Sequence, residues 1–271
     1  MSIINNIKKV LALVVVLLSL SVAYASESRT EADAEWQRAL EAYSNGEFGV
    51  ARDAWERVAQ LGYGSADLYY NLANAYYRLG QQGDTPFSQG ELGRAVLNYR
   101  RALRVDPSND DARYNLDIAV DHTNDTESLP QGVLGSMWAA VRGMMSSNGW
   151  AISSVVQLVL ALALTLLYLL SNTIVLRKVS FFVAVVLFCA LILSTILSLS
   201  QRALAQDSDT AVVVCNSITS VHASPDNTSK VIRQPSQGVT VRVLRSHGEW
   251  SEIEFADGEK GWIPSAIIEL V

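Results

Sequence analysis

The sequence predicts a multidomain protein with an all-α array of helix-turn-helix repeats, a two-helix transmembrane hairpin and a small all-β barrel. Three observations predict this fold class. Residues recur at a 34-residue spacing in the first half, two uncharged apolar runs lie ten residues apart near the middle, and short alternating apolar runs fill the segment after residue 206. With a formal charge of −6 over 271 residues, the chain is not a generally basic nucleic-acid-binding protein.

The first 25 residues have the pattern of a secretory signal peptide. Lys8 and Lys9 precede an apolar run from Val10 to Ala23, and an A-x-A site follows, with cleavage expected after Ala25. An uncleaved anchor is the alternative, but a run of this length spans only about 21 Å of a hydrocarbon core of about 30 Å. We therefore expect the segment that follows to be exported.

The two uncharged apolar runs predict transmembrane helices over 150–170 and 181–200. The connection between them contains Arg177 and Lys178, so the positive-inside rule places it in the cytoplasm and both flanking segments outside. Gln157 and the neighbouring serines mark either a polar pathway or a helix–helix contact. Neither span contains a charged residue that would indicate ion transport.

The exported segment contains about two and a half repeats. Gly46 and Gly80 are 34 residues apart, whereas Asn71 and its counterpart Asn115 are 44 apart, which indicates a ten-residue insertion near 81–90. Small and aromatic residues recur where neighbouring helices would touch. This pattern resembles the tetratricopeptide repeat (TPR), a helix-turn-helix unit. Since about three repeats are usually needed for stability, we expect the array to lean on the membrane-proximal segment or on a partner.

Polar side chains occupy positions at which the first helices of TPR units line a concave groove. They are Asn71, Asn74, Arg78, Arg113 and Asn115. The resemblance implies that they grip a peptide backbone or terminus. Polar packing between helices, or solvation, is the alternative explanation. Residues 26–149 contain 18 acids and 11 bases, which favours a peptide ligand over a nucleic acid.

Between the array and the first span, turn-forming residues predict a linker. Within it, Met137, Trp138, Val141 and Met144 recur at helical spacing. We expect Val133–Met145 to form a short helix that lies on the membrane surface.

The segment after residue 206 predicts a small β-barrel, because β-rich runs alternate with turns. The expected strands are Ala211–Val214, Ser220–His222, Lys230–Ile232, Thr240–Leu244, Trp250–Phe255, Gly261–Ile263 and Ile267–Val271. The order of Trp250, Asp257-Gly258 and Trp262 resembles the bacterial SH3 (SH3b) module, which commonly has arginine where this chain has His222. Trp250 and Trp262 form either a ligand-stacking surface or part of the barrel core.

The predicted domains follow one another in a fixed order. They are a signal peptide (1–25), TPR-like repeats (26–122), a linker and interfacial segment (123–149), a first transmembrane helix (150–170), a cytoplasmic loop (171–180), a second transmembrane helix (181–200) and an SH3b-like barrel (207–271).

This order is similar to that of the BatE-type family from bacterial aerotolerance (Bat) operons. The stretch from Leu92 to Leu103, continued through Asp106-Pro107 to Leu116, is the best match. The resemblance implies an accessory protein of the bacterial inner membrane with both modules periplasmic. It would work beside von Willebrand A-domain membrane proteins and a MoxR-type ATPase.

Two functions remain open. The first is a membrane-anchored scaffold or adaptor whose TPR and SH3 modules bind membrane or periplasmic proteins. The second is a peptidoglycan-binding module in which the TPR part is a spacer. We expect neither enzymatic activity nor a cofactor or metal, because the sequence holds no nucleophile motif, metal-ligand pattern or phosphate-binding loop. The expected partners are such proteins and the lipid bilayer, not nucleic acid.

Overall fold

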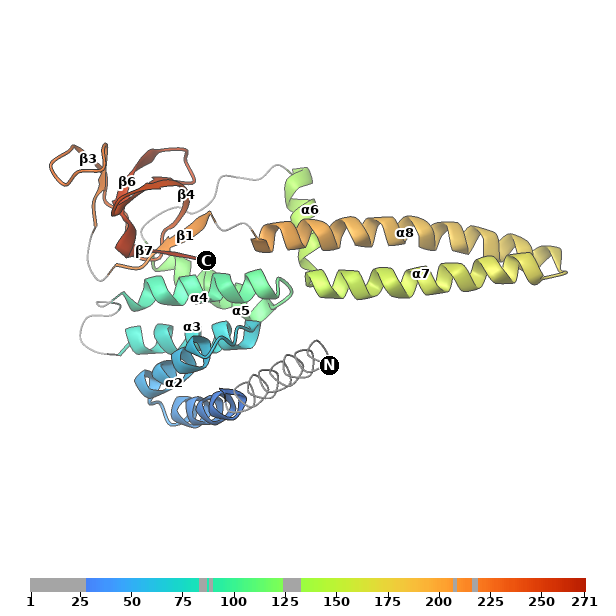
Figure 1. Cartoon of the computed structure of the whole chain (residues 1–271), viewed down its shortest axis with the longest axis horizontal. Coiled ribbons are helices and arrows are strands. Elements are labelled where there is room, and N and C mark those ends of the chain that lie inside the picture. The colour runs from blue at the N-terminus through green and yellow to red at the C-terminus, as the bar shows by residue number, and fades with distance from the viewer. Residues whose placement is uncertain (1–27, 83–86, 88–89, 124–132, 207–208, 216–218) are drawn as a thin grey trace, which may run out of the picture.

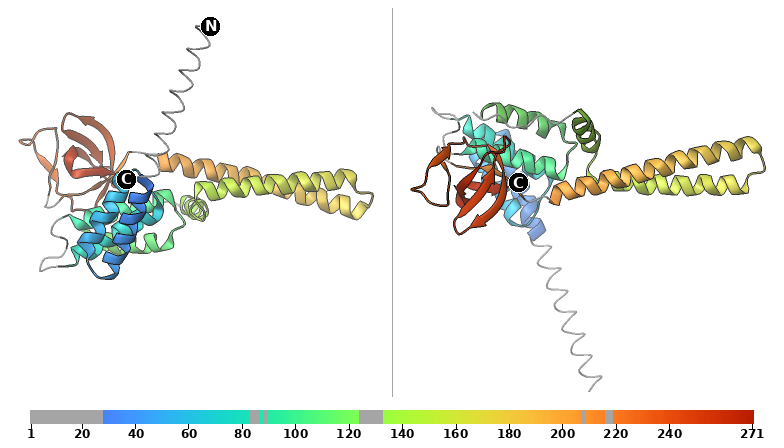
Figure 2. Two further views of the ribbon diagram at one scale, coloured as in Figure 1. Left: turned by 60° about the horizontal axis from the view of Figure 1, so that its bottom comes forward. Right: turned by 90° about the horizontal axis from the view of Figure 1, so that it is seen from above.

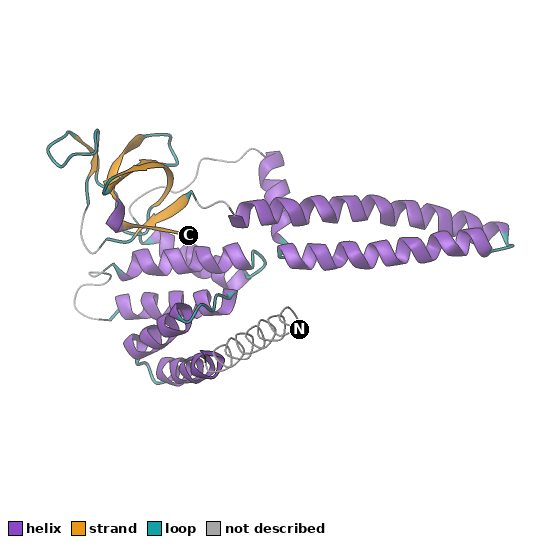
Figure 3. Cartoon of the chain, in the orientation of Figure 1, coloured by secondary structure: helices purple, strands orange, loops and turns teal. Residues whose placement is uncertain are grey.

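The computed structural model describes residues 28–82, 87, 90–123, 133–206, 209–215 and 219–271. These residues form a helical array, a long helical hairpin and an antiparallel sheet, so the predicted fold class is confirmed (Figures 1 and 3). The predicted signal peptide and residues 124–132 of the predicted linker lie outside the described residues.

The helical array packs its consecutive helices side by side. It consists of a helix over residues 28–44, α2 (Phe48–Gln60), α3 (Ala66–Gly80), α4 (Glu91–Val105) and α5 (Asp110–Asp121). Gly46 and Gly62 end the first two helices with φ of +80° and +88°, a left-handed conformation that glycine adopts without strain. Alanine lets helices approach closely at fully buried positions, among them Ala39, Ala51, Ala73, Ala95 and Ala102.

The segment 81–90 lies between α3 and α4, where the sequence indicates the insertion. Its residue Phe87 returns to the array and packs beside Tyr77 and His122, with ring centroids 5.4 and 5.5 Å away. The Phe87 amide also donates to the carbonyl of Gly80 over 2.7 Å, so this residue is held at the C-terminal end of α3.

A short helix, α6 (Val133–Gly143), precedes the hairpin of α7 (Ser147–Leu170) and α8 (Ile174–Gln206). Both hairpin helices are long and apolar enough to cross a membrane. They lie side by side along their length, and the array and the sheet are both at the end opposite the connection (Figures 1 and 2).

The connection of the hairpin is shorter than the predicted loop 171–180. Only Ser171–Thr173 is outside the helices, because α8 begins at Ile174 and includes Arg177 and Lys178. The predicted loop includes both charges, but this stretch has no glycine or proline to break a helix. The guanidinium group of Arg177 lies 5.2 Å from the ring centre of Tyr168 on the other hairpin helix, α7.

Polar residues within the hairpin join the two helices to each other. The Ser194 hydroxyl donates to Gln157 Oε1 over 2.9 Å, and Ser147 and Ser198 exchange hydroxyl-to-carbonyl bonds of 3.1 and 3.0 Å. These are helix–helix contacts, which is one of the two interpretations of Gln157 that the sequence allows.

The sheet has seven strands in the order β3-β2-β6-β5-β4-β1-β7. The strands are β1 (Thr210–Val213), β2 (Val221–His222), β3 (Val231–Arg233), β4 (Thr240–His247), β5 (Trp250–Glu254), β6 (Lys260–Pro264) and β7 (Ile268–Leu270). All pairs are antiparallel, and Gly248 and Gly258 make the tight turns on either side of β5 with positive φ. Val241, Ile253 and Ile263 belong to the buried core of this module.

Strand β1 is buried on both faces. Ala211 and Val213 pack into the core of the sheet, whereas Val212 joins the core of the helical array, with Val214 packed against it. Successive side chains of a strand point to opposite faces, so one strand contributes to two cores. The short array therefore leans on the sheet of its own chain.

Candidate interaction surfaces

A polar cluster links three helices inside the array. The Tyr99 hydroxyl donates to Asn74 Oδ1 over 2.6 Å, and Asn115 Nδ2 donates to the same oxygen over 3.1 Å and lies 3.4 Å from the Tyr70 hydroxyl. Tyr99 is 1% exposed, and burial raises its pKa, so its hydroxyl stays protonated as a donor. Asn74 and Asn115 thus serve packing between α3, α4 and α5 in the structure; a contact of theirs with a peptide stays a prediction.

Asn71 and Arg78 lie three residues before and four residues after Asn74, on the same side of α3. Asn71 is half-buried, and the exposed Arg78 places its guanidinium group 5.1 Å from the ring centre of Phe48. The structure therefore brings Asn71, Asn74, Arg78 and Asn115 to one region of the array.

Arg113 lies elsewhere. Its guanidinium group pairs with Asp110 and donates to the carbonyl of Pro107, so it ties the start of α5 to the preceding turn. On α5 it is two positions from Asn115, which turns the two side chains to nearly opposite sides of the helix. The structure does not bring Arg113 together with the other four predicted groove residues.

Trp250 and Trp262 stand on the outer face of the sheet. Ile253 and Ile263, which alternate with them along β5 and β6, are the residues that point into the core. Both tryptophans are half-buried, and Arg245 places its guanidinium group 5.4 Å from the Trp262 ring. Of the two interpretations of Trp262, the geometry favours the surface one.

His222 shares this outer face. It pairs in register with Trp262, its ring meets the Trp250 ring edge-on at 5.5 Å, and its Nδ1 lies 3.1 Å from the carbonyl of Ser229. His222 thus restricts the orientation of the Trp250 ring through their edge-on contact, and the contact with the Ser229 carbonyl orients the histidine ring. An arginine at this position would make a different contact with Trp250.

The fold and the order of these residues agree with comparisons with known families. Residues 218–269 match the bacterial SH3 domain family. Residues 83–119 match a TPR repeat family. No curated protein matches the chain. Both modules are typically non-catalytic, and they are typical of protein–protein interaction or, for the bacterial SH3 domain, of peptidoglycan binding outside the cytoplasm.

The residues that join the TPR and SH3b modules are absent from the sequence predictions. Gly93 of α4 faces the backbone of β1, where an added Cβ would lie 2.6 Å from the Val213 carbonyl oxygen. Gln237 reaches across from the SH3b module, accepts from the Gly93 amide over 3.2 Å and donates to the carbonyl of Phe87. Because Gly90 at the N-cap of α4 has no side chain, Gln237 supplies the missing cap.

Arginines of α4 hold the edge strand β7. Arg101 donates to Glu269 over 3.0 Å and to the carbonyl of Leu270 over 2.6 Å, and Arg104 donates to the main-chain oxygen of Val271. These contacts satisfy backbone groups on a strand that has a sheet neighbour on one side only.

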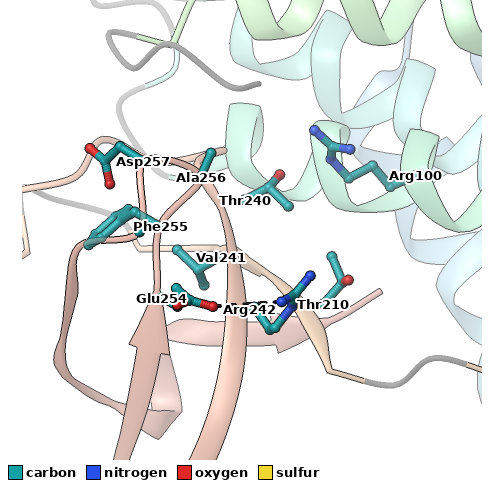
Figure 4. Close-up of a pocket in the computed structure, with 10 residues that line it drawn as sticks. Arg100, Thr210, Thr240, Val241, Arg242, Glu254, Phe255, Ala256 and Asp257 are labelled. Atoms are coloured by element: carbon teal, nitrogen blue, oxygen red, sulfur yellow. Dashed lines mark ion pairs between the residues drawn. The ribbon is translucent and has the colours of Figure 1, made fainter. Parts of the chain in front are cut away.

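A cleft of about 400 Å³ remains beside this junction (Figure 4). Arg100 from α4 faces it across from Thr240 and Asp257, and Arg242 and Glu254 form an ion pair of 3.7 Å in its wall. Charges of both signs line the cleft, and no group of three or more metal-ligating side chains occurs in the described part of the chain. The cleft has no feature that selects one class of ligand.

Proposed function

We propose that this protein is a membrane-anchored adaptor whose TPR and SH3b modules bind protein partners as one packed unit. The observation that carries the proposal is the burial of β1 on both faces, with Ala211, Val212 and Val213 each 0% exposed. The two modules present their surfaces in a fixed relation to each other and to the hairpin. A partner that contacts both would gain from the high local concentration of the second site, so weak individual contacts suffice.

Each module offers one surface for this purpose. On the TPR module, Asn71 and Arg78 flank the half-buried Asn74 on α3, and we propose that they grip the backbone of an extended peptide. On the SH3b module, Trp250 and Trp262 provide flat apolar rings beside a histidine and an arginine. Aromatic rings anchored in this way provide large contact areas at little cost in side-chain entropy.

We further propose that α7 and α8 span the bacterial inner membrane with both modules in the periplasm. Arg177 and Lys178 at the far end of the hairpin favour the cytoplasm for that end. The finer assignment is to a Bat-type aerotolerance complex with von Willebrand A-domain proteins and, through them, a MoxR-type ATPase. It rests on the order of the modules alone.

Crosslinking in membranes followed by affinity purification of the full chain tests the adaptor function. We expect a stoichiometric membrane or periplasmic protein to be recovered, and fewer crosslinks with the pair Asn71→Ala and Arg78→Ala or with Trp250→Ala. Recovery of no partner would refute the proposal. An alkaline-phosphatase fusion after Val271 should be active and one at Arg177 inactive; the reverse pattern would refute the orientation alone.

Peptidoglycan binding is the second candidate function, because the His222–Trp250 pair presents a ring on the outer face of an SH3b module. Sedimentation of the solubilised full chain with purified sacculi separates the candidates. The full chain is needed, since an isolated SH3b fragment would expose Val212 and Val214. Binding that is lost with Trp250→Ala favours the cell wall; no sedimentation excludes it.

A further inference from the structure

The base of the hairpin contains two neighbouring cavities that the adaptor function does not use. Helix α6 crosses the axis of the hairpin there and contacts α8, which in turn contacts α4 (Figure 1). The first cavity, of about 280 Å³, lies between α4, α6 and α8, and the second, of about 630 Å³, lies between α5 and α6. Arg113, Ala139 and Gly143 line both, so the two cavities adjoin each other at α6.

Positive charge gathers at the first cavity. Its lining includes Arg104, Arg113 and Arg142 and no acidic residue, although the surrounding segment of the chain is net acidic. Asp110, which pairs with Arg113, lies on the second cavity and offsets one of the three charges. Arg142 has no ion pair within the described residues. The lining thus carries an excess positive charge.

A buried amide also lines the first cavity. Gln201 of α8 is 7% exposed, and its Oε1 has no hydrogen-bond partner among the described residues. An unmet polar atom at such a depth destabilises the fold unless something binds it. The cavity therefore holds both charged donors and an acceptor that is open to a ligand hydroxyl or water.

Large apolar side chains of α6 and of the turn after it are exposed near the cavities. They are Trp138, Val141 and Met144, of which Met144 lines the second cavity. The indole of Trp150, at the start of α7, donates to the carbonyl of Arg142 over 3.1 Å and so ties α6 to the hairpin. A tryptophan and an exposed apolar helix face at this level are typical of a membrane interface.

We propose that these cavities bind the headgroup of an anionic phospholipid. The guanidinium groups of Arg113 and Arg142 would hold the phosphate, since arginine matches phosphate with paired hydrogen bonds. Gln201 would accept from a headgroup hydroxyl, and the acyl chains would follow the apolar faces of α6 and the hairpin. This inference rests on the proposal that α7 and α8 span a membrane.

The test uses the purified full chain in lipid nanodiscs of phosphatidylcholine with or without phosphatidylglycerol, with bound lipids counted by native mass spectrometry after release. We expect phosphatidylglycerol to be retained over phosphatidylcholine, and Arg142→Gln to lower that preference about tenfold. Arg202→Gln is the matched control. Arg202 follows Gln201 on α8 but is exposed and does not line either cavity, so its removal changes the same net charge without touching the site.

Equal retention of the two lipids by the wild-type chain overturns the proposal without any variant. Equal losses for Arg142→Gln and Arg202→Gln also overturn it, because they indicate general attraction of the surface to anionic lipid. Inorganic phosphate that competes fully with phosphatidylglycerol would show a free-phosphate site instead. Extraction of the chain from membranes by alkaline carbonate would refute the membrane-spanning proposal itself, and this readout is independent of lipid preference.

Discussion

Gly93→Ala is the sharpest probe of the contact between the TPR and SH3b modules. The new methyl group would lie 2.6 Å from the Val213 carbonyl oxygen, which must retreat by about 0.8 Å to reach ordinary contact at 3.4 Å. That oxygen accepts a 2.8 Å bond from the Gly238 amide, so its movement disturbs the pairing of β1 as well. Overpacking costs about 1–3 kcal/mol and the weakened hydrogen bond about 1 kcal/mol, whereas alanine in place of glycine gains about 1 kcal/mol in a helix.

We therefore expect Gly93→Ala to lower the free energy of unfolding by about 1–3 kcal/mol. Gly49→Ala is the control, since a Cβ at Gly49 in α2 meets nothing within 4 Å and should raise stability by about 0.5–1 kcal/mol. Thermal unfolding shows whether each variant is more or less stable than the wild-type chain. Hydrogen exchange of the β1 amides shows whether the change in stability lies at the contact between the modules. The reasoning is refuted if both variants are stabilised equally and β1 stays protected.

Three further predictions address single contacts. Gln237→Ala removes the cap of α4 and should cost about 1 kcal/mol, with faster amide exchange at Gly93, while the exposed Gln234→Ala should change neither. Burial raises the pKa of Tyr99 in the folded chain, so the contribution of its protonated hydroxyl to stability is fully present below pH 10 and is lost as the pH rises above it. Between pH 8 and 11, the free energy of unfolding should therefore fall less steeply with pH in Tyr99→Phe than in the wild-type chain. An unchanged slope would contradict this. Ser194→Ala should weaken the association of α7 with α8 by about 0.6 kcal/mol in a fluorescence-transfer assay of the hairpin, and no change would mean that the bond to Gln157 is not maintained in lipid.

Local sequence patterns predict most of the secondary structure elements. The strands that the alternating runs predict agree with the structure within one or two residues at most ends, because alternation reflects burial on one face of a sheet. Strand β4 is the exception and continues three residues past Leu244 to His247. Its last residues are polar and pair with β5 after a register shift between Val243 and Arg245, and a pairing of exposed residues leaves no hydrophobic signal.

The docking of the two modules was not predictable from those patterns, although one signal was available. Ala211–Val214 is apolar without alternation, which is typical of a strand covered on both faces. What covers the second face is a contact between residues more than a hundred positions apart, such as Gly93 and Val213, and no local spacing encodes it.

For the candidate surfaces too, the sequence predicts helix positions but not long-range contacts. The repeat register puts Asn71, Asn74 and Arg78 on one side of a helix, but it does not distinguish an amide that faces a ligand from one that contacts Tyr99. Arg113 matches a groove position by its place in the repeat. In the structure its side chain pairs with Asp110, three residues earlier in the same helix, and so stays at the start of α5.

The dual burial of β1 also sets an order of biosynthesis. Val212, Val214 and Val271 complete a core whose other members are made before α7 and α8. The first of the three follows α5 by about ninety residues, so the whole hairpin must leave the ribosome before the array can close. An unfinished or wrongly inserted hairpin would leave that apolar gap uncovered, as a target for quality-control proteases. Under the proposal that the hairpin spans a membrane, folding of the TPR and SH3b modules is in this way coupled to insertion of the hairpin.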